Sequence, residues 1–369
     1  MNRQRHPRIA AVAALILSVS ALAACASEDD ERGIKADRGA PSEISQDLID
    51  KATAEGKVVI YGNPPEDLWN RLIPAFEELY PGISIETVDL AGPELVQRYL
   101  SEVRTGSAAA DLIIDSSGST ILELAPEVAT RISTFDDGLP DFANPADGIY
   151  AIAADPSVML YNKVLLAEDE RPETLADMAR LAETYPEKLT TYATTSDNGY
   201  SQMWAFAEAL GEEAWDIFAT LAPATRYESS GGTMVQKLSQ GEYVGAYFQS
   251  GLVRGLLEPS GYADIIGWAY PADGTPVQPR YAAVMKEAAH PNAAALLQDY
   301  LLSTEGQTVV CASGLTAVRD DVVETCGDFS LTHIIDELGE ENVHIIPADM
   351  KVYDAKPKFE ARLQDLTGN

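Results

Sequence analysis

The chain has 369 residues, of which 46% are hydrophobic, and it carries a formal net charge of −32. This length and apolar content are enough for a folded protein of two domains, each with its own core. A chain this acidic is not expected to bind nucleic acid or an anionic lipid surface, but an acidic surface also aids solubility and identifies no ligand.

The first 24 residues have the pattern of a targeting signal. Three arginines precede an alanine-rich apolar run at 9–24, which is too short to span a membrane comfortably. The run ends in Leu-Ala-Ala before Cys25, which resembles a bacterial lipoprotein signal and implies cleavage before Cys25 and lipid attachment to its thiol. An ordinary secretory signal with an incidental cysteine is the alternative. Residues 25–42 are charged and lack periodicity, so they predict a flexible tether.

Two other cysteines, Cys311 and Cys326, remain in the chain. In an exported protein, two thiols at this spacing favour a disulfide that closes a small loop. The alternative is a pair of buried, unpaired thiols.

A strand–loop–helix–strand unit is predicted at 57–88. The β-branched and aromatic run at 58–61 predicts a strand, and turn residues follow it. Four apolar residues then recur at helical spacing: Leu68, Leu72, Phe76 and Leu79. Pro74 within this pattern predicts a kink or a break. Such units build parallel sheets, which bind ligands beyond the carboxyl ends of their strands, so the loop at 61–66 is expected to lie near a ligand.

The rest of the chain alternates helical and strand patterns, which predicts a doubly wound α/β lobe followed by a second lobe. The later predicted helices are 93–105, 118–124, 175–185, 200–210, 213–222, 234–239, 250–257 and 291–302, and the later strands are 111–115, 189–193, 243–248, 265–270 and 281–285. Residues 148–164 form two β runs broken at Asp155 and Pro156. This extended connection is where the chain is expected to cross into the second lobe.

With these elements placed, five segments resemble the bacterial extracellular solute-binding proteins of ABC importers, in the branch that includes ferric-iron, phosphonate and sugar-phosphate binders. The segments are EGKVVIYGNPPEDLWNRLIPAFEELYPGISIETV, ADLIIDSSGS, GIYAIAADPSVMLYNK, SQGEYVGAY and AAHPNAAALLQDYLLSTEGQ. Their order and spacing fit the family over residues of about 55 to 320.

The resemblance implies a fold of the type II periplasmic-binding-protein kind, with two doubly wound α/β lobes, a hinge and a ligand cleft between the lobes. Lobe 1 is expected at 43–152 plus 266–312, and lobe 2 at 153–265 plus 313–369. The implied function is capture of a small solute and its delivery to a membrane permease by a monomer without catalysis or cofactor. The protein is expected to be exported and held on the outer face of the cytoplasmic membrane through Cys25.

Three turns before helices combine small hydroxyl residues with glycine. The first N–H groups of a helix lack internal partners, and the helix dipole there favours negative charge, so these turns suit a carboxylate, phosphate or phosphonate. The same residue types are also good helix caps and turn formers. Because the turns match ligand positions of the family, the residues predicted to bind ligand are Ser116, Ser117, Ser196, Asn198, Ser230, Gly231, Gly232 and Thr233.

Further ligand contacts are predicted from the opening loop, from tyrosines and from arginines. Tyrosines can form aromatic walls or donate hydroxyls, although each also fits as a partly buried residue. An arginine near the cleft can meet an anion or serve as an internal ion-pair partner. The residues in question are Asn63, Tyr61, Tyr200, Tyr247 and Arg280, with Arg226 and Arg254 as further basic candidates.

Ferric iron is the alternative ligand. Ferric-binding relatives use an adjacent tyrosine pair, shortly after a segment like Gly241-Glu242, and this chain has Gly251-Leu252 where the pair would fall. The nearest aromatic pair, Tyr247-Phe248, has one hydroxyl. Fe(III) needs several oxygen anions, so a small organic or phosphorus-containing anion is ranked above iron, and no resident metal is expected.

An enzyme or a sensor subunit on the same fold is a remote alternative. The chain has four histidines without metal-ligand spacing and none of the common hydrolase motifs. Asp111 and Asp115 lie on one face of a predicted strand and could form an acid–base pair, but roles as a cap and a turn acid are favoured.

Overall fold

The computed structural model describes residues 43–107 and 109–367. The predicted signal, the lipidation site Cys25 and the tether at 25–42 lie outside the described residues. Within the described part of the chain, no helix is both long and apolar enough to cross a bilayer.

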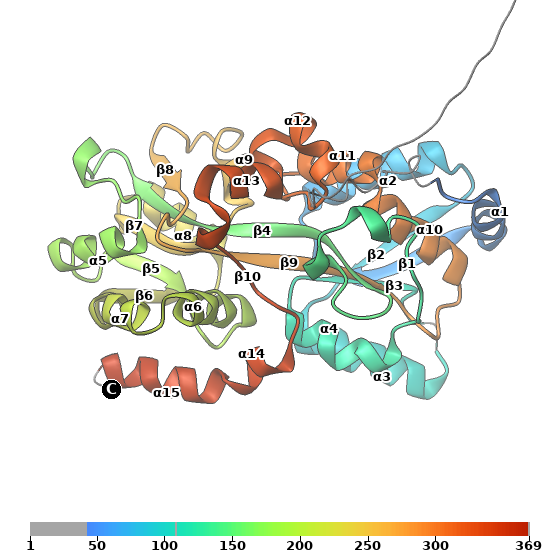
Figure 1. The fold of residues 1–369 in the computed structure, drawn as a ribbon, viewed down its shortest axis with the longest axis horizontal. Helices are drawn as coiled ribbons and strands as arrows, with labels where there is room; N and C mark the ends of the chain where they lie inside the picture. Colours follow the sequence, from blue (N-terminus) through green and yellow to red (C-terminus); the bar gives the residue numbers. More distant parts are fainter. Residues whose placement is uncertain (1–42, 108, 368–369) are drawn as a thin grey trace, which may run out of the picture. The chain divides into compact units, whose positions relative to one another are not determined.

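The strands form one sheet. They are β1 (Lys57–Gly62), β2 (Ser84–Asp89), β3 (Leu112–Asp115), β4 (Ile149–Asn162), β5 (Leu189–Tyr192), β6 (Thr225–Glu228), β7 (Gly245–Ser250), β8 (Ile266–Ala269), β9 (Thr275–Val284) and β10 (Val343–Ile345). Their order is β2-β1-β3-β9-β4-β7-β5-β6, with β10 paired to β9 and β8 paired to β4. The strands β2, β1 and β3 are parallel, as are β7, β5 and β6, whereas the long strands β4 and β9 are antiparallel to each other. The two parallel parts are therefore joined through β4 and β9 (Figure 1).

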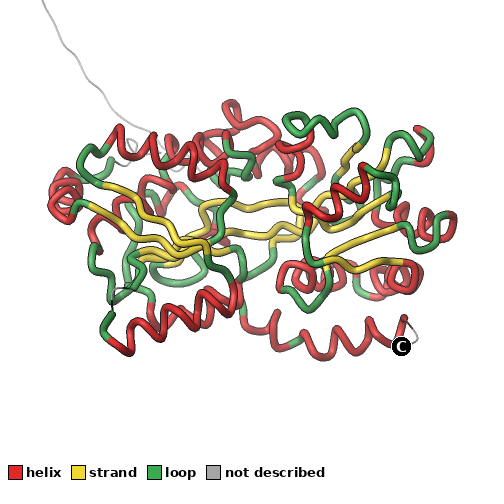
Figure 2. The backbone as a smooth tube through the Cα atoms, turned by 180° about the vertical axis from the view of Figure 1, so that it is seen from behind, coloured by secondary structure: helices red, strands yellow, loops and turns green. Residues whose placement is uncertain are grey.

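Helices lie on both sides of the sheet (Figure 2). They are α1 (Gln46–Glu55), α2 (Glu66–Leu79), α3 (Gly92–Thr105), α4 (Gly118–Leu124), α5 (Leu175–Thr184), α6 (Asp197–Leu210), α7 (Glu212–Ala224), α8 (Gly231–Ser239), α9 (Val253–Leu257), α10 (Pro291–Leu302), α11 (Thr304–Ala312), α12 (Val323–Cys326), α13 (Leu331–Leu338), α14 (Met350–Asp354) and α15 (Lys356–Thr367). In β3, Leu112 and Ile114 join the core formed with α2 and α10, whereas Ile113 joins the core formed with α3 and α4. Alternate residues of a strand point to opposite faces, so this part of the sheet is covered on both faces.

The helix α2 departs from its predicted form in two ways. It runs through Pro74 without a break, so of the predicted kink or break the break is absent. Leu68 and Leu72 are buried as predicted, but Leu79 is 43% exposed. Tyr80, at the next position of the stripe after Phe76, packs against the core in its place.

The strand β4 is continuous where the sequence predicts two runs broken at Asp155 and Pro156. Pro156 pairs with Val277 of β9, and Ser157 pairs with Ser250 of β7. The proline therefore stands where β4 changes from one partner strand to the other. Because the ladder changes partner there, the missing N–H of proline does not end the strand.

The strand β9 begins at Thr275, earlier than the predicted start at 281. Its first half contains Pro276 and Pro279, which had indicated a loop. Pro276 pairs with His344 of β10, and Pro279 pairs with Ala154 of β4.

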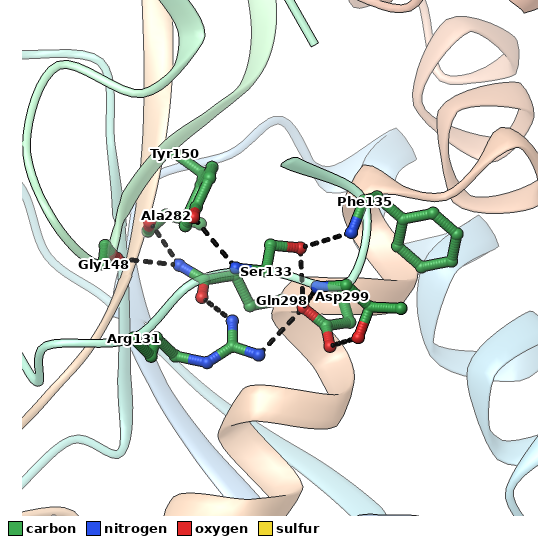
Figure 3. Close-up of polar contacts among 9 residues, drawn as sticks. Arg131, Ser133, Phe135, Gly148, Tyr150, Ala282, Gln298 and Asp299 are labelled. Carbon is green, nitrogen blue, oxygen red and sulfur yellow. Dashed lines mark hydrogen bonds and ion pairs between the residues drawn. The ribbon is translucent and has the colours of Figure 1, made fainter. Parts of the chain in front are cut away.

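A buried polar cluster ties α10 to the segment 131–135 (Figure 3). Asp299, which has no exposed surface, accepts hydrogen bonds from Arg131 Nη2 at 2.9 Å, Ser133 Oγ at 2.7 Å and Thr134 Oγ1 at 2.8 Å. Such a buried carboxylate is stable because the donors around it replace water.

Two glutamine amides connect α10 and α11 to the long strands. Gln298 donates from Nε2 to the carbonyl oxygens of Gly148, at 3.1 Å, and Ala282, at 2.8 Å. Gln307 donates to the carbonyl oxygen of Ile152 at 2.8 Å. One side chain, Gln298, therefore bonds both Gly148, the residue before β4, and Ala282, near the end of β9 (Figure 3).

A disulfide joins Cys311, in α11, to Cys326, in α12. The two cysteines are buried in a small cluster with Ala317 and Val322. The bridge closes a loop of sequence separation 15.

Candidate functional site

The three predicted turns are helix caps. Ser117, Ser196 and Ser230 are the N-cap residues of α4, α6 and α8, and each accepts a hydrogen bond from the backbone N–H three residues on. The turn residues before α8 are largely exposed, and Asn198 at the start of α6 is exposed as well. The capping role of these turns is thus present.

Two of the three turns meet each other. Asp197, the first residue of α6, accepts hydrogen bonds from Ser117 Oγ, at 2.5 Å, and from Ser119 Oγ. Ser116 is half-buried beside them. The turn before α8 lies apart from this contact. A Cβ atom at Gly231, the first residue of α8, would contact the hydroxyl of Tyr192 at the end of β5.

The three candidate tyrosines are bound within the chain. Tyr61 donates to Glu102 Oε2 at 2.8 Å, and Tyr200 donates to the carbonyl oxygen of Val352. Tyr247 shares a hydrogen bond of 3.0 Å with Thr225 Oγ1, and burial raises its pKa well above the usual value. All three side chains are buried in the cores around them.

Of the candidate arginines, Arg226 and Arg254 are engaged with partners within the chain. Arg226 is exposed and pairs with Glu187 at 2.6 Å. Arg254 is buried and donates to the carbonyl oxygen of Gly251, the hydroxyl of Tyr270 and the hydroxyl of Thr316, among other contacts. These bonds assign Arg254 to the structure around the end of β7.

Arg280 differs from both. Its side chain is on β9, the residue is 6% exposed, and Nη1 donates to Asn63 Oδ1 at 3.2 Å. Its Nε is buried and has no hydrogen-bond partner among the described residues. Burial lowers the pKa of this guanidinium, and the nearby carboxylates of Asp155 and Asp115 oppose that shift.

The acids near Arg280 are held by backbone N–H groups. Asp155 accepts from Thr316 N at 3.0 Å, and Asp115 accepts from Ser117 N at 2.6 Å and from Gly92 N at 3.2 Å. Burial raises the pKa of both carboxyls, whereas Arg280 acts in the opposite direction. An arginine with an unused buried donor in this setting can bind one more acceptor.

Polar side chains from the long strands and α6 lie in the same region. Gln278 pairs with Asp155 across β4 and β9, and its Oε1 accepts from Ser201 Oγ at 2.9 Å. Ser157 donates to Oε1 of Gln202. The sequence reasoning missed Gln278 because it treated the start of β9 as a loop; polar residues alternating at 278 and 280 were the available signal.

The acids at the ends of β3 have structural roles. Asp111 accepts from Val59 N at 2.8 Å and from the backbone N–H of His290 at 2.9 Å, and its other contact is His290 Nδ1 at 2.8 Å. Together with the bonds to Asp115, this assigns both acids to backbone support. They do not face each other as an acid–base pair.

Two surface cavities lie away from these residues. One, of about 720 Å³, is lined by residues near the edge strand β6, including Lys188, Arg226 and Lys237. The other, of about 510 Å³, lies beside Trp268 and His333. Arg226, one of the further basic candidates, lines the first cavity, whereas none of the other residues predicted to bind the ligand lines either cavity.

No three histidine, cysteine or acidic side chains in the described part of the chain gather in a way that could hold a metal ion. The phenols of Tyr200 and Tyr247 are also engaged within the chain.

A model of the bacterial extracellular solute-binding protein family matches residues 71–329. No curated protein sequence matches the chain. Solved structures similar to this one include a substrate-binding protein of an ABC transporter from Agrobacterium tumefaciens, with 20% identity, 84% of this chain and 94% of that chain covered, and a TM-score of 0.74.

Two further similar structures bind different ligands. Iron-bound HitA from Pseudomonas aeruginosa is 18% identical, with 84% of this chain and 99% of that chain covered and a TM-score of 0.63. The periplasmic binding protein AfuA from Actinobacillus pleuropneumoniae, with fructose-6-phosphate bound, is 18% identical, with 84% and 97% covered and a TM-score of 0.64. These likenesses confirm the predicted fold, an α/β fold of the type II periplasmic-binding-protein kind.

Proposed function

Because the chain belongs to the family of bacterial extracellular solute-binding proteins, we propose that it is the substrate-binding lipoprotein of an ABC importer. In this proposal Cys25 carries the lipid anchor, and residues 25–42 keep the folded part clear of the membrane. The protein captures a small solute and delivers it, chemically unchanged, to permease subunits. It acts as a monomer.

The proposed motion is a hinge movement about β4 and β9. These two long strands connect the parallel strands near β1 to those near β5. The proposed lobes are the two parts of the sheet with their covering helices, and closure of lobes around a ligand is an established class of transition. The solute would lie between them, beside the carboxyl ends of β1 and β3.

We propose that the solute is a small organic or phosphorus-containing anion, and the observation that carries this proposal is Arg280. A buried guanidinium normally uses all its donors, because an unpaired donor away from water is unfavourable. The unpartnered Nε of Arg280 is therefore a candidate for a bond to a solute oxygen. Its fork geometry suits carboxylate and phosphate groups. Asn63, which already bonds Arg280, is the proposed second contact.

The turn residues stay in this proposal as outer contacts. Ser116, Asn198 and the exposed turn before α8 would approach the solute only when it extends beyond Arg280. Tyr61, Tyr200 and Tyr247 are left out, because their hydroxyls are used within the chain.

The test is thermal stabilisation of the purified protein by a panel of phosphonates, sugar phosphates, aliphatic and aromatic carboxylates, and ferric citrate. A solute at about 100 times its dissociation constant adds about 2.7 kcal/mol of stability. We expect stabilisation by an organic anion, its loss in Arg280→Gln, and weakened but measurable binding in Arg280→Lys, which keeps the charge without the fork.

Arg226→Gln is the matched control, since Arg226 is exposed and paired with Glu187. It should bind as the unaltered protein does. Circular dichroism shows whether the Arg280 variants are folded. Equal stabilisation of Arg280→Gln and Arg226→Gln would contradict the assigned role of Arg280. Stabilisation by ferric iron alone, with a visible phenolate charge-transfer band, would establish the iron alternative.

A further inference from the structure

The contact between α4 and α6 uses the hydroxyl protons of Ser117 and Ser119, at the start of α4. Ser117 and Ser119 each donate to the same oxygen of Asp197, and the two hydroxyls are 2.9 Å apart. A hydroxyl has one proton to donate. In this arrangement these serines bridge two helices that belong to different parts of the sheet, and neither has a proton left for a solute.

A C-terminal strap, residues 343–367, passes the same place. It lies outside the residues matched by the family model. Its strand β10 pairs with the start of β9, and it then continues through α14 and α15 (Figure 1). The hydroxyl of Tyr353 lies against Gly118 of α4, while the carbonyl oxygen of Val352 accepts from Tyr200 of α6. The strap thus contacts both α4 and α6 through two consecutive residues, Tyr353 and Val352.

The strap also adds a positive charge beside Asp197. Lys356 Nζ is 3.8 Å from Asp197 Oδ1, donates to the carbonyl oxygen of Thr195 at 3.4 Å, and stands 5.4 Å from the centre of the Tyr200 ring. The remainder of α15 is anchored on α7, where Arg362 pairs with Glu212 at 2.6 Å. Asp197 therefore has two hydroxyl donors on one side and an ammonium group on the other.

We propose that Asp197, Ser117, Ser119 and the strap form a latch that holds α4 against α6 in the absence of solute. The latch acts in the hinge movement of the proposed receptor, so this inference rests on the proposed function. The latch favours the arrangement in which α4 and α6 are in contact, and this raises solute affinity. When the binding-competent state is already populated, none of the binding free energy is used to shift the conformational equilibrium. Asp197 does not compete with the solute, whose charge is met at Arg280.

The experiment measures the latch without any solute. Spin labels are attached to cysteines placed at Gln97 on α3 and Glu213 on α7, both exposed, in a Cys25→Ser background that leaves the disulfide pair intact. Distances between the labels are recorded by double electron–electron resonance. We expect Asp197→Ala to add a population with longer distances than the unaltered protein shows.

Ser119→Ala separates the latch from helix capping, since Ser117 and not Ser119 caps α4. It should shift the distances in the same direction. The double variant with Asp197→Ala should shift them no further than Asp197→Ala alone, because the two residues share one interaction. Asp216→Ala, which removes an exposed acid from α7, should leave the distribution unchanged.

Unchanged distances in both Asp197→Ala and Ser119→Ala would overturn the latch. So would tighter solute binding by Asp197→Ala, because it would mean that Asp197 occupies the place of the solute. Failure of every anion to bind would refute the proposed anionic solute, whereas the distance measurement, made without solute, would still decide for or against the latch.

Discussion

Gly118→Ala tests whether the strap lies against α4. A Cβ atom at Gly118 would stand less than 3.0 Å from the hydroxyl oxygen of Tyr353 and 3.3 Å from Cζ of the same ring. The ring is rigid, so the strap or the helix has to move. Overpacking of this kind destabilises a protein by about 1–3 kcal/mol. In an open helical position the same change would stabilise by roughly 0.5–1 kcal/mol.

Whether Gly118→Ala lowers or raises the free energy of unfolding therefore depends on Tyr353. Tyr353→Phe removes the atom that Cβ would meet first, and Cζ, at 3.3 Å, then needs to yield only slightly. Gly118→Ala should be destabilising in the unaltered protein and neutral or stabilising in Tyr353→Phe. Gly232→Ala is the matched control, because its nearest neighbour is Ser230 Oγ at 3.7 Å and it too lies in the first turn of a helix.

Urea unfolding followed by tryptophan fluorescence gives the four free energies of the cycle. A coupling of about 1–3 kcal/mol between positions 118 and 353 is expected, which is the relieved overpacking. Additive effects, with the same penalty for Gly118→Ala in both backgrounds, would refute the placement of Tyr353 against α4 and with it the strap.

Two further predictions concern stability. Asp299→Asn should destabilise the protein by about 3–5 kcal/mol, because it breaks the buried ion pair with Arg131 and turns an amide donor toward other donors. Urea unfolding measures the loss of stability. A change below about 1 kcal/mol would show that the cluster in Figure 3 contributes little to stability. Stability should fall by about 3 kcal/mol, the value for a closed loop of this size, when the disulfide is reduced or when Cys311→Ser and Cys326→Ser are made together. An unchanged melting temperature in dithiothreitol, with free thiols confirmed by titration, would contradict this prediction.

Local patterns in the sequence predicted local structure well. The period of apolar residues located β1, α2 and β3, and the small polar residues before α4, α6 and α8 located three helix starts. These features depend on neighbours within a few residues, which is the range over which periodicity and capping act. The two prolines in β9 gave the wrong indication, because partner strands far along the chain decide where a missing N–H is tolerated.

The candidate site was harder to predict, because a donor's role depends on its partners. Arg254 and Arg280 look alike in sequence. Yet Arg254 donates to a carbonyl, a phenol and a threonine hydroxyl, whereas Nε of Arg280 has no partner among the described residues. Similarly, the partner of Ser117 is Asp197, 80 residues away. The sequence also does not separate an aromatic residue in a cleft wall from one in a core when the strand or helix that carries it is buried on every side. Tyr247, which is buried, was a candidate for this reason.

The bonds of Gln298 to Gly148 and Ala282 have a mechanical consequence. They tie α10 to Gly148, the residue before β4, and to Ala282 near the end of β9. In the proposed hinge movement, α10 would therefore stay with this end of the two strands. Bending would then be expected farther along them, toward Pro156, where β4 changes its partner.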